Sequence, residues 1–130
     1  MHPRRANTAH TVYGQSLVET GLVVEMRSLA TIHPLGPGVA DVDAGVLRKE
    51  LFTRATAQGL TQPVLTGYIA LSVGGTLSVG GVGYDIRKGA QVDYVRELQV
   101  VTGEGRVVWC SETVEGPGRT PQPHRRRSHS

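Results

Sequence analysis

The stretch LSVGGTLSVGGVG, residues 71–83, places five glycines between two apolar runs. Glycine loses more conformational freedom on folding than any other residue, so a cluster indicates left-handed backbone or a close approach by another group. The stretch contains neither G-x-G-x-x-G nor G-x-x-x-x-G-K-[ST]. Successive bare N–H groups can form an anion-binding concavity, and a diphosphate commonly needs one, with Thr76 and Ser78 as added hydroxyl donors. A tight turn or bulge without a ligand is the alternative.

The segments before this stretch predict two strands and a helix. GLVVEM (21–26) is a short β-branched run that indicates a buried strand, and VADVDAG (39–45) alternates apolar and acidic residues, as a strand with one wet face does. The pattern of residues 44–60 has the period of a helix, and Gly59 is a stop signal. Its apolar stripe comprises Val46, Leu47, Leu51, Ala55 and Gln58, opposite Arg48, Lys49, Glu50 and Arg54.

The segments after it predict a hairpin. Prolines and glycines punctuate residues 60–91, which argues against long regular elements there. YVRELQVV (94–101) and RVVWCSE (106–112) flank TGEG (102–105), as the strands of a hairpin flank a glycine-containing loop. These elements predict an α+β domain over residues 1–114. Residues 115–130 have no apolar anchor, and their Pro/Arg/His-rich composition predicts a disordered tail.

Composition and charge exclude several classes of protein. The 130 residues favour one domain, and the single cysteine, Cys110, forbids an internal disulfide and the usual zinc patterns. No apolar run approaches the roughly 20 residues of a membrane span, and the N-terminus lacks a secretory signal, so we expect no membrane association and a cytoplasmic location. The net charge of +3 belongs to the segment from Glu115 onward, which holds four arginines and one glutamate.

The segment AHTVYGQ (9–15) holds a histidine, His10, ahead of the first predicted strand. A lone histidine is more often a surface or satisfied core residue than a functional one, and its spacing alone does not separate these alternatives.

Taken in order, three segments carry a resemblance to a known family. They are AHTVYGQ, then GLTQPVLTGYIALSVGGTLSVGGVG (59–83), then LQVVTGEGRVVWCS (98–111). The chain resembles the FAD-binding (PCMH-type) domain of the vanillyl-alcohol oxidase superfamily, and is most similar to cytokinin dehydrogenase and berberine-bridge-like FAD-linked oxidases. The resemblance runs from about residue 5 to residue 112 and implies a partial α+β domain of that fold.

The resemblance also implies roles for individual residues. His10 falls where many family members attach FAD covalently through the 8α-methyl of the flavin, a reaction that needs a neutral imidazole nitrogen. The glycine-rich block falls where the family wraps the diphosphate and the inner edge of the flavin. The implied cofactor-binding residues are His10, Thr11, Gln15, Ser72, Gly74, Gly75, Thr76, Ser78, Gly81 and Val82.

The chain departs from the family pattern in three places. The first loop reads RRANTAH (4–10), where the family carries glycines. Cytokinin dehydrogenases have the substrate-deprotonating Asp immediately before a Tyr, whereas this chain has Gly67 before Tyr68, so the catalytic residues stay unknown. The family's first strand and its substrate domain have no counterpart here, and we expect a truncated reading frame.

Three hypotheses follow. The first is the FAD-binding part of a flavin-dependent oxidoreductase that transfers hydride from a C–H bond next to O or N of a small-molecule substrate. The second is a non-functional fragment without enzymatic activity. The third is a basic binding module formed by RRR (125–127) with His124 and His129, which we do not favour because no aromatic residue interleaves with the arginines; no nucleic-acid partner is therefore expected.

Overall fold

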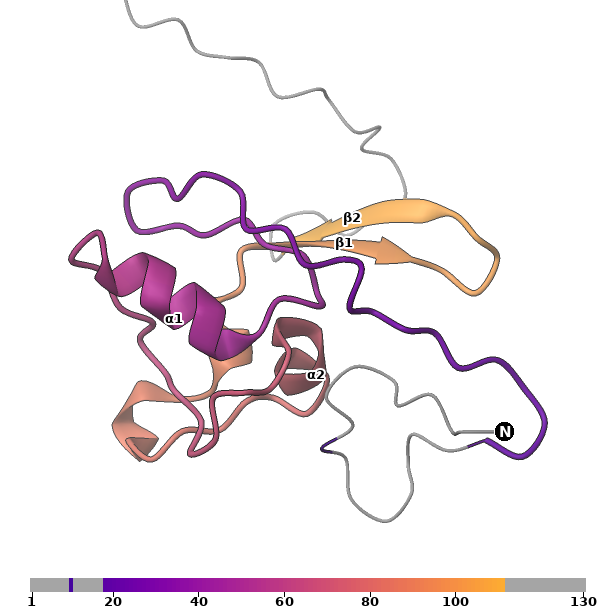
Figure 1. Cartoon of the computed structure of the whole chain (residues 1–130), viewed down its shortest axis with the longest axis horizontal. Helices are drawn as coiled ribbons and strands as arrows, with labels where there is room; N and C mark the ends of the chain where they lie inside the picture. The colour runs from indigo at the N-terminus through magenta and orange to yellow at the C-terminus, as the bar shows by residue number, and fades with distance from the viewer. Residues whose placement is uncertain (1–9, 11–17, 112–130) are drawn as a thin grey trace, which may run out of the picture. The chain divides into compact units, whose positions relative to one another are not determined.

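The computed structural model describes His10 and residues 18–111 (Figure 1). These residues belong to two compact units, and the boundary between the units along the chain falls between Tyr94 and Val95. In the first unit lie helices α1 (Arg48–Thr56) and α2 (Val73–Ser78) and the short 3₁₀ helices η1 (Ile86–Lys88) and η2 (Gln91–Tyr94) (Figure 1). The second unit contains strands β1 (Glu97–Val101) and β2 (Val107–Ser111). The predicted boundary at residue 114 and the predicted tail lie outside the described residues.

Helix α1 confirms the predicted helix but begins later. The Glu50 carboxylate accepts a hydrogen bond from the N–H of Leu47 at 3.2 Å, which supplies one half of a capping box. Gly59 has a φ of +72° and ends the helical turn, as predicted. Residues 44–47 stay outside the helix because they bond instead to the glycine-rich stretch: the carbonyl of Val46 accepts from Val73 N–H and that of Ala44 from Gly74 N–H, both at 2.8 Å.

The core of the first unit is small. The buried apolar side chains of the described residues are Val46, Leu51, Ala55, Val64 and Val73. Val46, Leu51 and Val73 form one cluster, so the start of α1 and the start of α2 pack on one another. Four partly buried side chains surround this cluster: Ile32, Leu35, Val42 and Leu77. Hydrophobic burial scales with the apolar area removed from water, so a cluster of this size gives the unit a small margin of stability.

Both predicted early strands are wrong. Residues 21–26 form no strand, and Leu22 is 87% exposed, because β-prone residues need a neighbouring strand and the described residues offer none to this segment. Residues 39–45 turn back on residues 31–36 through isolated bridges, Ile32 with Val42 and Gly36 with Val39, rather than as part of a sheet. Asp43 stabilises this turn, because its carboxylate accepts the N–H of Thr31 at 2.9 Å.

The predicted hairpin is confirmed with shorter strands. Strands β1 and β2 pair antiparallel, with Glu97 opposite Ser111 and Val101 opposite Val107. The connection between them closes by a 2.8 Å bond from Thr102 N–H to the Arg106 carbonyl, and Gly105 adopts a φ of +77°. Helices in one unit and an antiparallel hairpin in the other agree with the α+β class.

Candidate functional site

The glycine-rich stretch contains a helix, not only a loop. The Ser72 hydroxyl caps α2 by accepting the N–H of Gly75 at 3.2 Å. Gly74 lies against residue 44: a Cβ at position 74 would stand 2.9 Å from the Cβ of Ala44. The group that approaches Gly74 is therefore Ala44 of the same chain, and glycine is required there by packing.

Two hydroxyls predicted to face a ligand bond within the chain. Thr76 is 2% exposed, and its Oγ1 donates to the Val73 carbonyl at 3.0 Å while accepting from Arg48 Nε at 2.9 Å. The Ser78 hydroxyl donates to the Gly74 carbonyl at 2.8 Å. These two side chains hold α2 in place.

A left-handed turn follows α2 at Gly80–Val82. Gly80 and Gly81 have φ values of +91° and +67°. Their carbonyls accept hydrogen bonds from Val92 N–H at 3.3 Å and Gln91 N–H at 3.0 Å, respectively. The N–H groups of Gly81 and Val82 donate no hydrogen bond to any part of the chain that the structure describes. Successive N–H groups in such a turn make a concavity that suits an anion.

Gln91 holds this turn in shape, although no pattern in the sequence predicts this role. Its side chain is 5% exposed, and its Nε2 donates to the Val64 carbonyl at 3.1 Å. A Cβ added to Gly81 would collide with the Gln91 side chain, at 2.8 Å from its Cβ. Glycine is thus required at position 81 for two reasons: the backbone is left-handed, and the Gln91 side chain leaves no room for a Cβ. Gln91 Oε1 is buried without a hydrogen-bond partner among the described residues.

Arg48 is buried, although it lies on the predicted polar face of the helix. It is 7% exposed, and besides Thr76 it bonds through Nη1 to Gln62 Oε1 at 3.0 Å. Burial lowers the pKa of Arg48 to about 10. Its Nη2 is buried and finds no acceptor within the described part of the chain. The guanidinium therefore links α1 to α2 from inside the unit.

His10, the predicted attachment residue, lies exposed beside Tyr68. The two ring centroids are 4.6 Å apart, with the ring planes at 66°, an edge-to-face arrangement. The structure thus brings His10 next to the segment that leads into α2. Thr11 and Gln15 lie outside the described residues.

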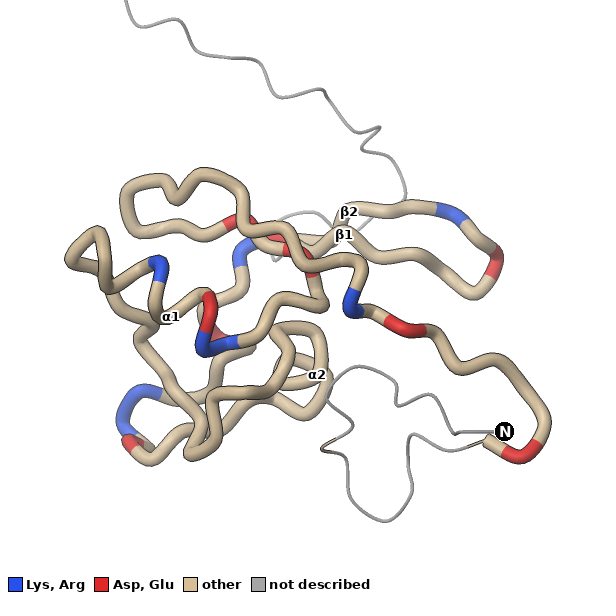
Figure 2. Tube along the Cα trace, viewed as in Figure 1, with Lys and Arg blue, Asp and Glu red and all other residues tan. Residues whose placement is uncertain are grey.

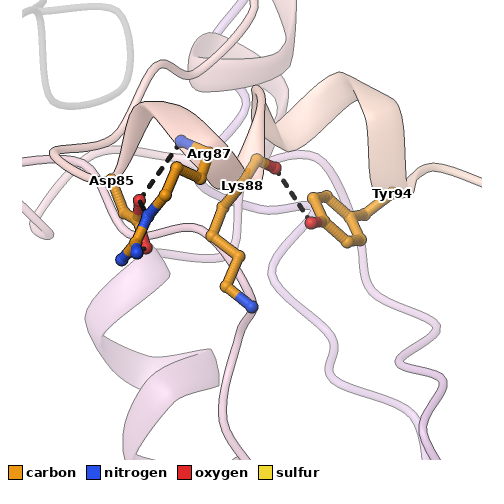
Figure 3. A network of polar contacts seen from close by, with 4 residues as sticks. All are labelled: Asp85, Arg87, Lys88 and Tyr94. Carbon is orange, nitrogen blue, oxygen red and sulfur yellow. Dashed lines mark hydrogen bonds and ion pairs between the residues drawn. The ribbon is translucent and has the colours of Figure 1, made fainter.

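The acidic residues after the glycines bond locally. Figure 3 shows the Asp85 carboxylate with Arg87, whose Nε donates to it at 2.9 Å, and Tyr94, whose hydroxyl donates to the Lys88 carbonyl at 2.9 Å. The hydrogen bonds from the Arg87 side chain and backbone hold the pKa of Asp85 below its ordinary value. Asp93 accepts the N–H of Ala90 at 2.7 Å. The bond between Tyr94 and Lys88 joins η2 to η1.

The segment of chain that contains the turn carries no formal charge. From Ala55 to Tyr84 there is no Lys, Arg, Asp or Glu, and Figure 2 shows this stretch as an uninterrupted tan tube. An anion at Gly80–Val82 would meet backbone N–H dipoles and no carboxylate from this stretch. The described residues contain no His/Cys/Asp/Glu group that could hold a metal ion, and none of their helices is long and apolar enough to cross a membrane.

Comparison with known proteins decides the family. A model of the FAD binding domain matches residues 5–111. The chain belongs to the FAD binding domain family. This match covers the predicted resemblance and includes both the glycine turn and His10.

Named relatives point the same way. The chain is 41% identical over 105 residues to an uncharacterized oxidoreductase, ORF5 in the fasciation locus of Rhodococcoides fascians, covering 80% of this chain and 24% of the relative. It is 39% identical over 118 residues to cytokinin dehydrogenase 8 of Oryza sativa subsp. indica, covering 80% and 22%. It is 36% identical over 108 residues to cytokinin dehydrogenase 1 of Arabidopsis thaliana, covering 79% of this chain and 19% of the relative. The chain thus spans about a quarter or less of these relatives.

The residues of this FAD binding domain fit FAD at one place in particular. At Gly80–Val82, two N–H groups stay without acceptors in the described region, and the space around Gly80 is open, with nothing within 4 Å of an added Cβ. Val82, which follows, is 69% exposed. Bare donors beside an exposed apolar side chain suit a ligand that combines a diphosphate with a planar ring.

Proposed function

We propose that this chain forms the FAD-binding part of a flavin-dependent oxidoreductase with the PCMH-type fold of the vanillyl-alcohol oxidase superfamily. The observation that carries the proposal is the turn at Gly80–Val82, in which the N–H groups of Gly81 and Val82 would donate to diphosphate oxygens of FAD. Ser72, Gly74, Gly75, Thr76 and Ser78 would serve this site indirectly, because they form and seat the helix that leads into the turn.

The side of the site that would hold the flavin ring is proposed from His10. Its imidazole is exposed and rests on Tyr68, so a ring nitrogen is accessible to a ligand. His10 would hold the flavin covalently, through one of its ring nitrogens to the 8α carbon. The resemblance implies that Thr11 and Gln15 also contribute to FAD binding.

When bound, FAD supplies a hydride acceptor for a substrate C–H bond next to oxygen or nitrogen, and oxygen or another acceptor reoxidises it. We propose a small molecule of this class as the substrate, and no nucleic-acid or membrane partner. Some relatives are named cytokinin dehydrogenases, but we do not extend that substrate to this chain. Position 67 is glycine and provides no carboxylate beside Tyr68.

The visible absorbance of the purified chain, repeated on its acid-precipitated pellet, tests both parts of the proposal. A flavin spectrum that stays with the pellet and is lost from it in His10→Ala is expected for covalent attachment. A flavin spectrum that moves to the supernatant would retain FAD binding and refute the role of His10. A chain that binds no flavin, even after incubation with FAD, would refute the proposed function.

A chain without enzymatic activity is the second candidate, and one observation favours it. The core of the first unit is small, while many large apolar side chains of the described residues are exposed, Leu22, Tyr84 and Ile86 each at 87%. Circular dichroism with limited proteolysis separates the candidates, because a flavin site needs a protease-resistant core that persists with FAD present.

A further inference from the structure

Arg48 is a buried cation without a counter-ion in the described part of the chain. It is 7% exposed, and the two groups that accept its hydrogen bonds, the Thr76 hydroxyl and the Gln62 side-chain carbonyl, are uncharged. The ion pairs of the described residues join other arginines to other carboxylates. Desolvation lowers the pKa of Arg48 only to about 10, so the guanidinium is charged at pH 7. A buried charge of this kind is costly unless an opposite charge compensates it.

One hydrogen bond of Arg48 leads to the helix that precedes the glycine turn. Thr76, which accepts from Arg48 Nε at 2.9 Å, lies in the second half of α2. The N–H of Gly80 donates to the Leu77 carbonyl at 3.2 Å, so the chain stays coiled from Thr76 to the turn. A coiled chain rises only about 1.5–2 Å per residue, which brings the turn to within about 10 Å of Thr76.

A second hydrogen bond of Arg48 leads to the segment that supports Gln91. Arg48 Nη1 donates to Gln62 Oε1 at 3.0 Å, and Gln62 Nε2 donates to the Arg48 carbonyl at 3.3 Å. Nearby in the chain, the Val64 carbonyl accepts from the side chain of Gln91, whose backbone N–H donates to the Gly81 carbonyl. The guanidinium is therefore fixed between the two segments that also hold the turn.

We propose that the buried positive charge of Arg48 stabilises a diphosphate bound at the glycine turn, acting through the protein interior without touching the ligand. The inference rests on the proposed function. No charged residue lies between Ala55 and Tyr84, and Glu50 on α1 is exposed, so solvent screens its carboxylate. A charge fixed in a medium of low dielectric acts over such distances and needs no reorganisation when the anion binds. The diphosphate would supply the opposite charge that Arg48 lacks in the described chain.

Calorimetric titration of the same variants with two ligands of different charge tests this role. Inorganic pyrophosphate and ADP-ribose both present a diphosphate, but pyrophosphate is the more negative at pH 7 without magnesium. The energy of an ion in a field scales with its charge, whereas a displaced turn would weaken both ligands alike. Arg48→Met is expected to weaken pyrophosphate binding about tenfold and ADP-ribose binding about fivefold. Arg48→Gln, a second neutral variant that keeps a donor for Thr76, should give the same order of losses.

Arg54→Met is the matched control, because it removes the same charge from an exposed position on the same helix, where solvent screens it. It should change neither affinity. If the unaltered chain binds FAD and the neutral variants of Arg48 weaken both ligands equally, or neither, the inference is wrong and the proposed function stands. If the unaltered chain binds neither FAD nor pyrophosphate, the inference and the proposed function both fail.

Discussion

Replacement of Gly81 by alanine tests how the glycine turn is held. Gly81 has a φ of +67°, which costs a non-glycine residue about 1–2 kcal/mol. The new Cβ would also stand 2.8 Å from the Cβ of Gln91, whose side chain is held by its bond to the Val64 carbonyl. Overpacking of this kind costs about 1–3 kcal/mol. Together, Gly81→Ala should lower the free energy of unfolding by about 2–5 kcal/mol.

Gly80→Ala provides the matched control. Gly80 also has a positive φ, +91°, but nothing lies within 4 Å of an added Cβ. It should therefore lose only the conformational part, about 1–2 kcal/mol. Urea unfolding followed by circular dichroism measures both variants on one scale. If Gly81→Ala is no less stable than Gly80→Ala, the contact between Gly81 and Gln91 does not hold the turn and the reasoning fails.

Three further substitutions test the surrounding structure by the same unfolding assay. Ser72→Ala removes the cap on the Gly75 N–H and should cost about 1 kcal/mol, and an unchanged urea midpoint would contradict the cap. Arg48→Ala should cost about 2–4 kcal/mol, and Arg48→Met clearly less, because methionine refills the volume without a buried charge; equal losses would refute this. Hydrogen bonds from Thr31 lower the pKa of the Asp43 carboxyl in the folded chain. The stability that these bonds contribute is therefore present above the ordinary pKa of an aspartate, and it is lost as the pH falls through the lowered pKa of the folded state. Between about pH 5 and pH 2.5, Asp43→Asn should therefore lose less stability than the unaltered chain, and parallel curves would count against it.

Local patterns predicted the elements that need no distant partner. Helix α1 follows from its apolar period and Gly59, and the hairpin from two β-branched runs around residues 102–105. Residues 21–26 have the same β-branched character but no strand beside them in the described chain, and propensity alone forms no sheet.

Distant contacts account for the remaining differences. Helix α2 contains two glycines, which disfavour helices, and is held by its Ser72 cap and by packing against Ala44. The helical period placed Arg48 opposite the apolar stripe of α1. It could not reveal that Thr76 of α2 lies beside Arg48 and accepts a hydrogen bond from it. The role of Gln91 depends on the Val64 carbonyl, which is distant in sequence, so no local signal exists for it.

The glycine-rich stretch has two parts, the helix α2 and the turn at Gly80–Val82 that follows it. The predicted diphosphate loop assigned one role to residues 72–82, whereas the structure uses residues up to Ser78 to build and seat a helix. In the turn that follows, the N–H of Gly80 donates to the Leu77 carbonyl, and those of Gly81 and Val82 donate to no acceptor among the described residues. The ligand assignment of each residue stays a prediction.

Calorimetric titration of the chain with FAD, alone and in the presence of inorganic pyrophosphate, tests the central claim most directly. The account predicts one FAD bound per chain, with an apparent affinity that falls as pyrophosphate rises, because both would accept from the N–H groups of Gly81 and Val82. Absence of FAD binding, or binding that pyrophosphate leaves unchanged, would contradict the assignment of the turn to the diphosphate.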